Sequence, residues 1–242
     1  MPAGFRLGRI LVAVLVLTLA GCSADGRPTT ADDDAPAPTA TSSRDAGGSP
    51  PECAPPRVCN GPLVPGEYES TSIGPTIRFT VGEDWLAGAD LPGEGFFLQD
   101  RSQRAPAAMT VMPFPGEVFA DPCEVGTTQP AAPGSEAAVG WLTDQPFLDV
   151  RAQSEVTVGD RPALLVEAEV AVAGICEDPV VYLWPLPEST EFHLNDAEQV
   201  RFLLVDVGDQ TLAIVLEAFP DADVEGFFSR AQEVLDTVSF AD

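Results

Sequence analysis

The chain contains one histidine, His193, within the segment Glu191-Phe192-His193-Leu194. A Ser-His-Asp or Cys-His device would need this residue as its general base. The sequence has no G-x-S-x-G motif that could present a nucleophilic serine. One histidine is also too few for catalytic zinc, which usually takes several His or Cys ligands. We therefore expect a protein that is not an enzyme, with no catalytic residue, no metal ligand and no cofactor, and no residue type marks a ligand-binding position.

A run of acids near the C-terminus has the spacing of a calcium loop. Asp221, Asp223 and Glu225 are followed by Gly226, as at the start of an EF-hand loop. That loop needs a bidentate glutamate at a position where this chain has Gln232. The same acids suit the first turn of a helix, where carboxylates complement the helix dipole. We expect helix capping here.

The first cysteine, Cys22, ends the tetrapeptide Leu19-Ala20-Gly21-Cys22. Arg6 and Arg9 come first, and the apolar stretch Ile10–Ala20 follows, which is typical of an export signal. The stretch is too short to span a bilayer as a helix, which needs about 20 residues. The tetrapeptide resembles a bacterial lipobox, and this resemblance implies cleavage before Cys22 and acylation of its thiol, for example by palmitate. An ordinary secretory signal is the alternative.

Four further cysteines, Cys53, Cys59, Cys123 and Cys176, form an even set, which in an exported chain indicates two disulfides. Three connectivities are open. We expect the local pair Cys53–Cys59, which leaves Cys123–Cys176 to join a loop to the end of a strand. A structural zinc site is the alternative, but the spacings match no finger-like pattern. No C-x-x-C motif indicates redox-active thiols.

The organisation of the chain follows from these features. Residues 1–21 are expected to be a lipoprotein signal peptide, residues 22–59 a lipid anchor and a disordered tether rich in Pro, Thr, Ala and Asp, and residues 60–242 a globular domain. Residues 23–50 contain no aromatic or branched aliphatic side chain, so they cannot bury enough apolar surface to fold. Such a tether spans about 30 Å. The run 32–34, three aspartates, is interpreted as solvated charge rather than a cation site.

The chain is strongly acidic. It has 38 Asp and Glu residues against 12 Arg and no Lys, for a formal net charge of −26. Nucleic-acid binding needs clustered basic residues, so this class of function is excluded. Adsorption to anionic lipid headgroups is disfavoured as well. Contact with the membrane would therefore depend on the lipid at Cys22.

Alternating apolar and polar residues predict half-buried strands at 76–81, 148–158 and 164–172. In the second segment, five apolar residues of one parity predict a single buried face: Leu148, Val150, Ala152, Val156 and Val158. Gly159-Asp160 and Gly208-Asp209 predict tight hairpin turns with positive φ. Two later segments have apolar residues at both odd and even positions, which predicts central strands covered on both faces: Phe202–Val207 and Leu212–Ala218. Shorter strands are expected near Gly95–Gln99, Ala108–Pro113 and Val180–Trp184.

Helical spacing of apolar residues predicts a helix over Val224–Val238. A shorter helix is expected over Ser135–Thr143, with Ser135 as its N-cap and Pro146 preventing its continuation. The predicted fold class is α+β: a mainly antiparallel sheet packed by the C-terminal helix and by the shorter one.

Trp85, Trp141 and Trp184 are expected in the core, each with its indole N–H satisfied. Trp184 lies between Tyr182 and Pro185, and the alternative is that it lines a groove for a sugar or a lipid.

Several motifs resemble those of actinobacterial cell-envelope lipoproteins with a PsbP-like α/β/α sandwich domain. The matching segments are 65–68, 79–85, 121–123, 138–142, 157–160, Cys176 and 234–240. The lysine-free, Ala/Gly/Pro/Arg-rich composition is also similar to that of actinobacterial proteins. The resemblance covers most of residues 62–240 and implies a fold, an anchor and a helper-type protein, but no reaction.

Together these features predict a membrane-anchored lipoprotein on the extracytoplasmic face of the cell membrane. We expect it to be non-enzymatic and to bind a partner protein or a small ligand at the cell envelope. One alternative is an extracellular sensing or regulatory module. The other is an envelope hydrolase that uses carboxylates alone, since 38 acids supply many carboxylate pairs.

Overall fold

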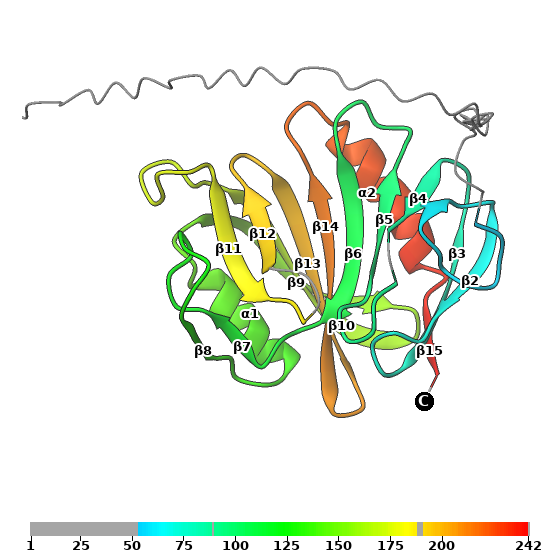
Figure 1. Cartoon of the computed structure of the whole chain (residues 1–242), viewed down its shortest axis with the longest axis horizontal. Helices are drawn as coiled ribbons and strands as arrows, with labels where there is room; N and C mark the ends of the chain where they lie inside the picture. Colours follow the sequence, from blue (N-terminus) through cyan, green and yellow to red (C-terminus); the bar gives the residue numbers. More distant parts are fainter. Residues whose placement is uncertain (1–52, 89, 188–190, 242) are drawn as a thin grey trace, which may run out of the picture. The chain divides into compact units, whose positions relative to one another are not determined.

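The structure is a computed structural model that describes residues 53–88, 90–187 and 191–241 (Figure 1). All of them belong to the compact unit Gly47–Asp242. The expected signal peptide, the acylation site Cys22 and the aspartates at 32–34 lie outside the described residues. Within these ranges, no helix is long and apolar enough to cross a membrane.

A central sheet of eight strands organises the domain (Figure 1). Its ladders are all antiparallel, which confirms the predicted α+β class with a mainly antiparallel sheet. In spatial order the strands are β1 (Gly61–Pro62), β4 (Trp85–Ala87), β5 (Phe96–Asp100), β6 (Ala107–Pro113), β14 (Gln210–Ala218), β13 (Gln199–Val207), β10 (Arg161–Val170) and β9 (Leu148–Val158).

The hairpin β13–β14 lies at the centre of this sheet. This position is predicted by the apolar side chains at both odd and even positions of the two strands. Gly208 has φ 66° in its turn, and Gly159 has φ 60° in the turn between β9 and β10, so both predicted turns are confirmed. A side chain at Gly159 would also place its Cβ 2.1 Å from the carbonyl oxygen of Val238. Glycine is therefore required there by conformation and by space.

One face of the sheet is covered by helix α2 (Val224–Leu235) and a small sheet of order β15-β3-β2. These strands are β2 (Gly66–Ser70), β3 (Thr76–Val81) and β15 (Ser239–Ala241). Phe227 and Leu235 of α2 pack into this core. Each such side chain stabilises the fold by about 1.5–3 kcal/mol.

Helix α2 ends at Leu235, three residues before the predicted end at Val238. Thr237 explains the early end: its hydroxyl donates to the carbonyl oxygen of Val234 at 2.7 Å and accepts from the amide of Thr80 at 2.8 Å. The chain then continues as β15, which pairs with β3. Strand pairing thus replaces the last helical turn that local periodicity favours.

The opposite face is covered by helix α1 (Ser135–Thr143) and two small hairpins. The hairpins are β7 (Glu117–Phe119) with β8 (Thr128–Pro130), and β11 (Val180–Pro185) with β12 (Glu191–Asn195). Ala138 and Leu142 of α1 pack into this second core.

The N-cap of α1 is Gly134, so the expectation that Ser135 caps the helix is wrong. Ser135 is instead the first helical residue. Its amide donates to Asp206 Oδ1 at 3.1 Å and its hydroxyl to Asp206 Oδ2 at 2.8 Å. A carboxylate from β13 therefore binds the N-terminus of α1, where a negative charge is favourable.

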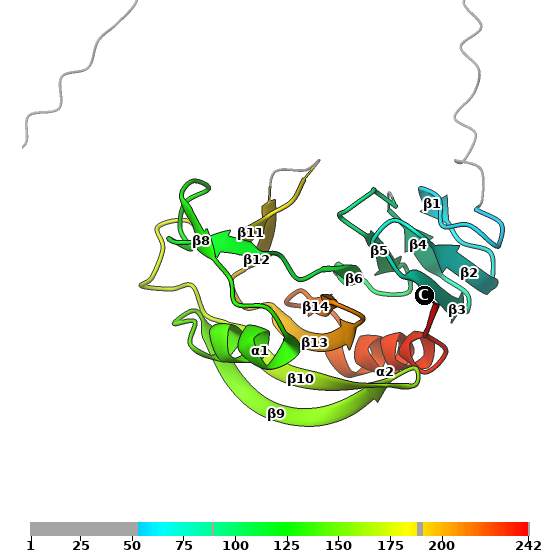
Figure 2. The same cartoon turned by 90° about the horizontal axis from the view of Figure 1, so that it is seen from below.

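Strand β9 does not bury a single face, contrary to prediction. Leu148 and Val150 pack in the core under α1, whereas Val156 and Val158 pack in the core under α2. The register with β10 shifts in between, and this bulge reverses the side-chain parity. Ala152 lies in the exposed middle of the strand. Figure 2 shows the long β9–β10 hairpin curving past both helices.

Residues 53–59, which the sequence analysis placed in the tether, contact the folded domain. Cys53 is 1% exposed, and its amide donates to the carbonyl oxygen of Pro62 at 2.7 Å. The hydroxyl of Tyr68 donates to the carbonyl oxygens of Cys53 at 2.6 Å and Val64 at 2.8 Å. Burial raises the pKa of Tyr68 above its ordinary value. These bonds attach the segment to β2.

Candidate binding groove

An apolar groove lies between strands β5 and β6 on one side and the β11–β12 hairpin on the other. Its volume is about 220 Å³. The lining is mostly aliphatic, aromatic and thioether side chains, with one carboxylate and one hydroxyl: Leu91, Glu94, Gly95, Phe96, Phe97, Thr110, Met112, Leu186 and Phe192. We refer to it as the Phe97 groove.

The pairing of β5 with β6 forms one wall of the groove. Phe97 lies opposite Thr110 in the antiparallel register, so both side chains occupy the same face of the sheet. Met112, two residues along β6, shares this face. Phe97 is 38% exposed, which is unusual for a phenylalanine in a strand.

A glycine allows the adjacent turn to close over the groove. Gly95 has φ +100°, and a Cβ there would lie 1.9 Å from the carbonyl oxygen of Val111. Its amide donates to the carbonyl oxygen of Leu91 at 3.1 Å. Only glycine permits this approach, which brings Leu91 to the edge of the groove.

The second wall is Phe192 of β12. Its ring stacks on Trp184, with centroids 4.8 Å apart and planes inclined by 18°. Trp184 itself is fully buried, and its indole N–H points to Met112 Sδ at 3.3 Å. Trp184 is therefore core behind the groove, and Phe192 is the aromatic surface that it supports. Trp85 is also buried, and Trp141 is partly buried in α1.

A pair of acids lies next to the groove. The hydroxyl of Thr110 donates to Glu217 Oε2 at 3.2 Å, and Glu217 of β14 faces the same side of the sheet. Burial raises the pKa of Glu217 to about 8, and the nearby charge of Glu198 adds to this effect. The bond from Thr110 opposes the shift. Glu217 therefore carries a proton at neutral pH.

Glu198 precedes β13 and is 0% exposed. Burial raises its pKa, opposed by hydrogen bonds from Asn195, whose amide donates to Glu198 Oε1 at 2.6 Å. Glu198 Oε2 has no hydrogen-bond partner in the part of the chain that the structure describes. Four arginines of the described residues, Arg78, Arg151, Arg201 and Arg230, form ion pairs with other acids: Glu69, Glu169, Glu167 and Asp100, respectively. None of these four ion pairs includes Glu198 or Glu217.

His193 faces away from the groove. Its neighbours Phe192 and Leu194 are buried, so strand alternation places His193 on the outer face of β12. Its Nδ1 is 3.9 Å from Glu191 Oε1, and its ring meets Tyr182 edge-on at 6.1 Å. The structure does not join this histidine to the acid pair.

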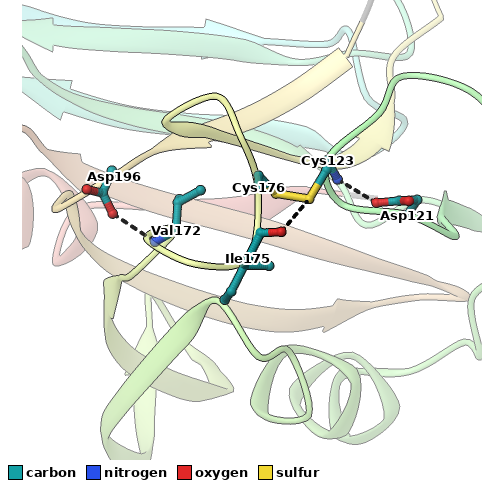
Figure 3. Close-up of a disulfide and its surroundings, with 6 residues drawn as sticks. All are labelled: Asp121, Cys123, Val172, Ile175, Cys176 and Asp196. Atoms are coloured by element: carbon teal, nitrogen blue, oxygen red, sulfur yellow. Dashed lines mark hydrogen bonds between the residues drawn. A yellow bond between two sulfur atoms is a disulfide. The ribbon is translucent and has the colours of Figure 1, made fainter. Parts of the chain in front are cut away.

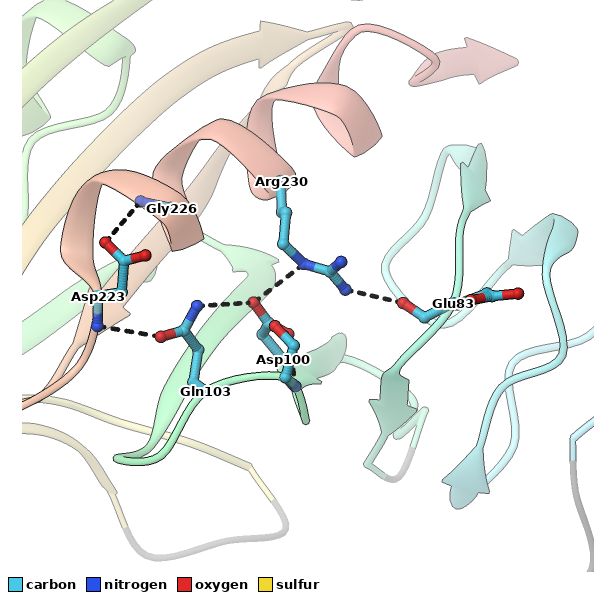
Figure 4. Close-up of polar contacts among 7 residues, drawn as sticks. Glu83, Asp100, Gln103, Asp223, Gly226 and Arg230 are labelled. Atoms are coloured by element: carbon cyan, nitrogen blue, oxygen red, sulfur yellow. Dashed lines mark hydrogen bonds and ion pairs between the residues drawn. The ribbon is translucent and has the colours of Figure 1, made fainter.

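One of the acids at the start of α2 caps the helix, as expected. Asp223 is the N-cap, and its Oδ1 accepts from the amide of Gly226 at 3.1 Å (Figure 4). Within residues 53–88, 90–187 and 191–241, no group of three or more His, Cys, Asp or Glu residues is placed to hold a metal ion. Arg230 of α2 binds Asp100 at 3.1 Å and donates to the carbonyl oxygen of Glu83 at 2.7 Å, which ties α2 to the β4–β5 hairpin (Figure 4).

Both expected disulfides are present, Cys53–Cys59 and Cys123–Cys176. The second joins the loop after β7 to the loop before β11 (Figure 3). Asp121 Oδ1 accepts from the amide of Cys123 at 2.9 Å. The pair Cys123–Cys176 therefore holds two loops together and leaves no thiol for chemistry.

Sequence reasoning missed the groove. Phe97, Phe192, Thr110, Glu198 and Glu217 were not singled out. One signal was available: Phe96 and Phe97 are adjacent in a predicted strand, so their rings lie on opposite faces of the sheet, and each face must be covered if both rings are to be buried. An acid between Leu216 and Ala218 in a central strand was a second signal.

No family model matches the chain, and no curated protein matches it. Two of the similar solved structures are distant. A crystal structure from Bacteroides thetaiotaomicron VPI-5482 is 12% identical with a TM-score of 0.37, covering 69% of this chain and 45% of that one. This chain therefore spans less than half the length of that protein.

The second structure is LpqN of Mycobacterium tuberculosis, described as involved in cell envelope biogenesis. It is 13% identical with a TM-score of 0.43, and the match covers 73% of this chain and 91% of that one. At these TM-scores, neither likeness carries an argument about the function of this chain.

Proposed function

We propose that this protein is a lipid-anchored, extracytoplasmic, non-enzymatic binding protein whose globular domain takes an apolar group of a partner protein or small ligand into the Phe97 groove. The observation that carries the proposal is an open apolar groove with an aromatic side chain, Phe97, at 38% exposure. Apolar pockets with a few polar groups are the usual form of binding sites.

The compartment is supported by the cysteines. Two disulfides suit an oxidising environment outside the cytoplasm. The basic and apolar N-terminus and the lipobox-like tetrapeptide ending at Cys22 favour export and acylation. An acyl chain on Cys22 would hold the acidic domain near a membrane that its charge does not favour.

The acid pair is the feature that would suit a carboxylate-dependent hydrolase. Such an enzyme needs two carboxyl groups that flank the substrate bond. Glu198 is 0% exposed, so a substrate in the groove could not reach it. This burial favours binding over hydrolysis.

The test compares two surface substitutions in the mature lipoprotein purified from its host. In native mass spectrometry and cross-linking, Phe97→Ser is expected to lose a co-purifying ligand or partner that the unchanged protein retains. Val125→Ser is the matched control, because Val125 is 53% exposed on a loop outside the groove. Equal retention by both variants, or turnover of a cell-wall polymer by the purified protein, would contradict the proposal.

A further inference from the structure

We propose that the acid pair, Glu198 and Glu217, is a proton-dependent switch for the β11–β12 hairpin. While Glu217 carries its proton, the turn 195–198 stays packed beside β14. Loss of the proton releases this turn from the sheet, and the base of the hairpin with it. The inference is independent of what the Phe97 groove binds, because the switch consists of groups inside the fold.

The burial of Glu198 is the first observation. Its side chain is 0% exposed, and Oε1 accepts from the side-chain amide of Asn195 at 2.6 Å. The other oxygen, Oε2, has no hydrogen-bond partner among the described residues. A buried carboxylate that is only half satisfied is costly, so this arrangement tolerates little further negative charge nearby.

Strand pairing places Glu217 beside Glu198. Glu217 of β14 lies opposite Val200 of β13, and Glu198 precedes Val200 by two positions. Both acids therefore lie on the same side of the sheet, and Glu198 is close enough to perturb Glu217. Diagonal neighbours of this kind are about 7–8 Å apart. Two negative charges at such a separation inside a protein repel each other strongly.

The proton on Glu217 prevents this repulsion. The polar groups placed around Glu217 are neutral or acidic: Thr110 of β6, Gln99 of β5, Glu198 of the turn, Asn195 of β12 and Glu94 at the groove. Burial raises the pKa of Glu217 to about 8, and the charge of Glu198 adds to this effect. Ionisation of Glu217 therefore gives the pair a second charge in a place without a cation among these groups.

The turn 195–198 is the part of the site that can move. Glu217 lies within β14, which is paired with β13 on one side and with β6 on the other. Glu198 lies outside the strands, and Ala197 before it has φ 64°. A residue with a Cβ adopts this left-handed conformation only at a cost, so the turn depends on the bonds around it. Repulsion is therefore relieved by movement of the turn rather than of the strand.

The turn joins the β11–β12 hairpin to the sheet. In the part of the chain that the structure describes, β11 and β12 form a separate two-stranded sheet. The amide of Ala197 donates to the carbonyl oxygen of Val170 at 2.8 Å, and the amide of Val172 donates to Asp196 Oδ1 at 2.8 Å (Figure 3). The amide of Asp196 donates to the carbonyl oxygen of Pro179, just before β11, at 2.9 Å. Movement of the turn thus loosens the base of the hairpin.

The direction of the pH effect follows from proton linkage. The closed state keeps the proton on Glu217 up to about pH 8, whereas an exposed glutamate releases it at the ordinary pKa of 4.5. Between these values the open state binds fewer protons, so a rise of one pH unit favours opening by up to about tenfold. The hairpin is thus held in acid and loosens toward pH 8, above which the effect levels off.

The test is amide hydrogen exchange of the ¹⁵N-labelled mature chain at pH 5 and pH 8. Rates are expressed as protection factors, which correct for the chemical exchange rate at each pH. The reporters are the amides of Val172, Asp196 and Ala197. Their protection is expected to fall by at least about tenfold from pH 5 to pH 8. It should also stay below that of Phe202 and Leu203 in the central strand β13.

Four variants separate the acid pair from other titrating groups. Glu217→Gln should remove the fall in protection at the reporters, and Glu198→Gln should reduce it, because the charge of Glu198 contributes to the shift of Glu217. His193→Gln changes the histidine on the outer face of β12 and should leave the fall unchanged. Glu155→Gln, an exposed acid in β9, should also leave it unchanged. Dispersed amide spectra report that each variant is folded.

Three results would overturn the switch. The first is protection at the reporters that is the same at pH 5 and pH 8. The second is an equal fall in Glu217→Gln. The third is equal protection of the turn and of the central strand, because the proton would then be lost only when the whole domain unfolds. Ligand retention by Phe97→Ser is a separate measurement and decides the proposed function alone.

Discussion

At the scale of single residues, Glu217 has a raised pKa for a carboxyl group. It is an acid in a central strand whose neighbours Leu216 and Ala218 are buried. Its folded-state pKa of about 8 exceeds the ordinary value of 4.5, because burial and Glu198 disfavour the charged form. The native state therefore keeps a proton that the unfolded chain releases above pH 4.5.

This linkage predicts a pH-dependent effect of Glu217→Gln. Between about pH 4.5 and 8, the unfolded state binds fewer protons than the native state, so the contribution of Glu217 to stability falls as pH rises. The glutamine side chain does not titrate, so the stability of the variant does not fall with pH for this reason. We expect its free energy of unfolding to match that of the unchanged protein at pH 5 and to exceed it by about 1–3 kcal/mol at pH 9. Urea denaturation at the two pH values measures the difference.

The control for this prediction is Glu155→Gln, which removes one negative charge from an exposed position. Its difference from the unchanged protein should stay small at both pH values. A Glu217→Gln difference that is the same at pH 5 and pH 9 would show that the acid titrates normally in the folded protein.

At the scale of elements, α1 depends on a residue from a distant strand. Asp206 of β13 accepts hydrogen bonds from the amide and hydroxyl of Ser135, and also from the hydroxyl of Thr211 at 2.7 Å. The helix has no side-chain cap of its own, because its N-cap is Gly134. Its N-terminus is thus stabilised by tertiary contact.

We expect Asp206→Ala to destabilise the domain by about 0.5–2 kcal/mol, the usual effect of losing a helix cap. Asp149→Ala is the comparison, since Asp149 is exposed in β9 and none of the described side-chain hydrogen bonds involves it. Thermal unfolding followed by circular dichroism measures both. Equal melting temperatures for the two variants would contradict a capping role for Asp206.

The two disulfides should differ in their effect on stability. On the chain-entropy model, the short loop closed by Cys53–Cys59 contributes about 2 kcal/mol and the long loop closed by Cys123–Cys176 about 4 kcal/mol. Paired Cys→Ser substitutions at each disulfide, compared by denaturant midpoint, give the two values. A larger loss from removing Cys53–Cys59 would contradict this order and show that its packing on β2 outweighs loop entropy.

At the scale of the whole molecule, the proposed attachment to a membrane depends on the acyl group on Cys22, because a formal net charge of −26 disfavours binding to anionic headgroups. Two acyl chains or more bind a membrane stably, whereas one chain gives marginal binding.

We expect Cys22→Ser to release the protein from the membrane fraction of its host into the soluble exported fraction. Intact-mass analysis should show acyl groups on the unchanged protein and none on the variant. Cys53→Ser, which removes a different cysteine, should leave the membrane fraction unchanged. An unacylated mature form of the unchanged protein would contradict the anchor.

Sequence patterns predicted most of the local structure. The β13–β14 hairpin, both glycine turns and the start of α2 follow from apolar patterns and turn residues that act over a few positions. The single buried face of β9 was wrong, because one bulge reverses parity and periodicity cannot detect it. The end of α2 was wrong because pairing of β15 with β3 competes with helical propensity.

By itself, the sequence determined the α+β class, the even set of four cysteines and the acidic composition without lysine, since each depends on composition or on neighbours along the chain. Only the tertiary structure decided the Phe97 groove and the acid pair beside it. Thr110 and Glu217 are separated by 107 positions in the sequence and meet because β6 lies beside β14 in the sheet. Strand order is set by packing of the two cores as a whole, and no local pattern encodes it.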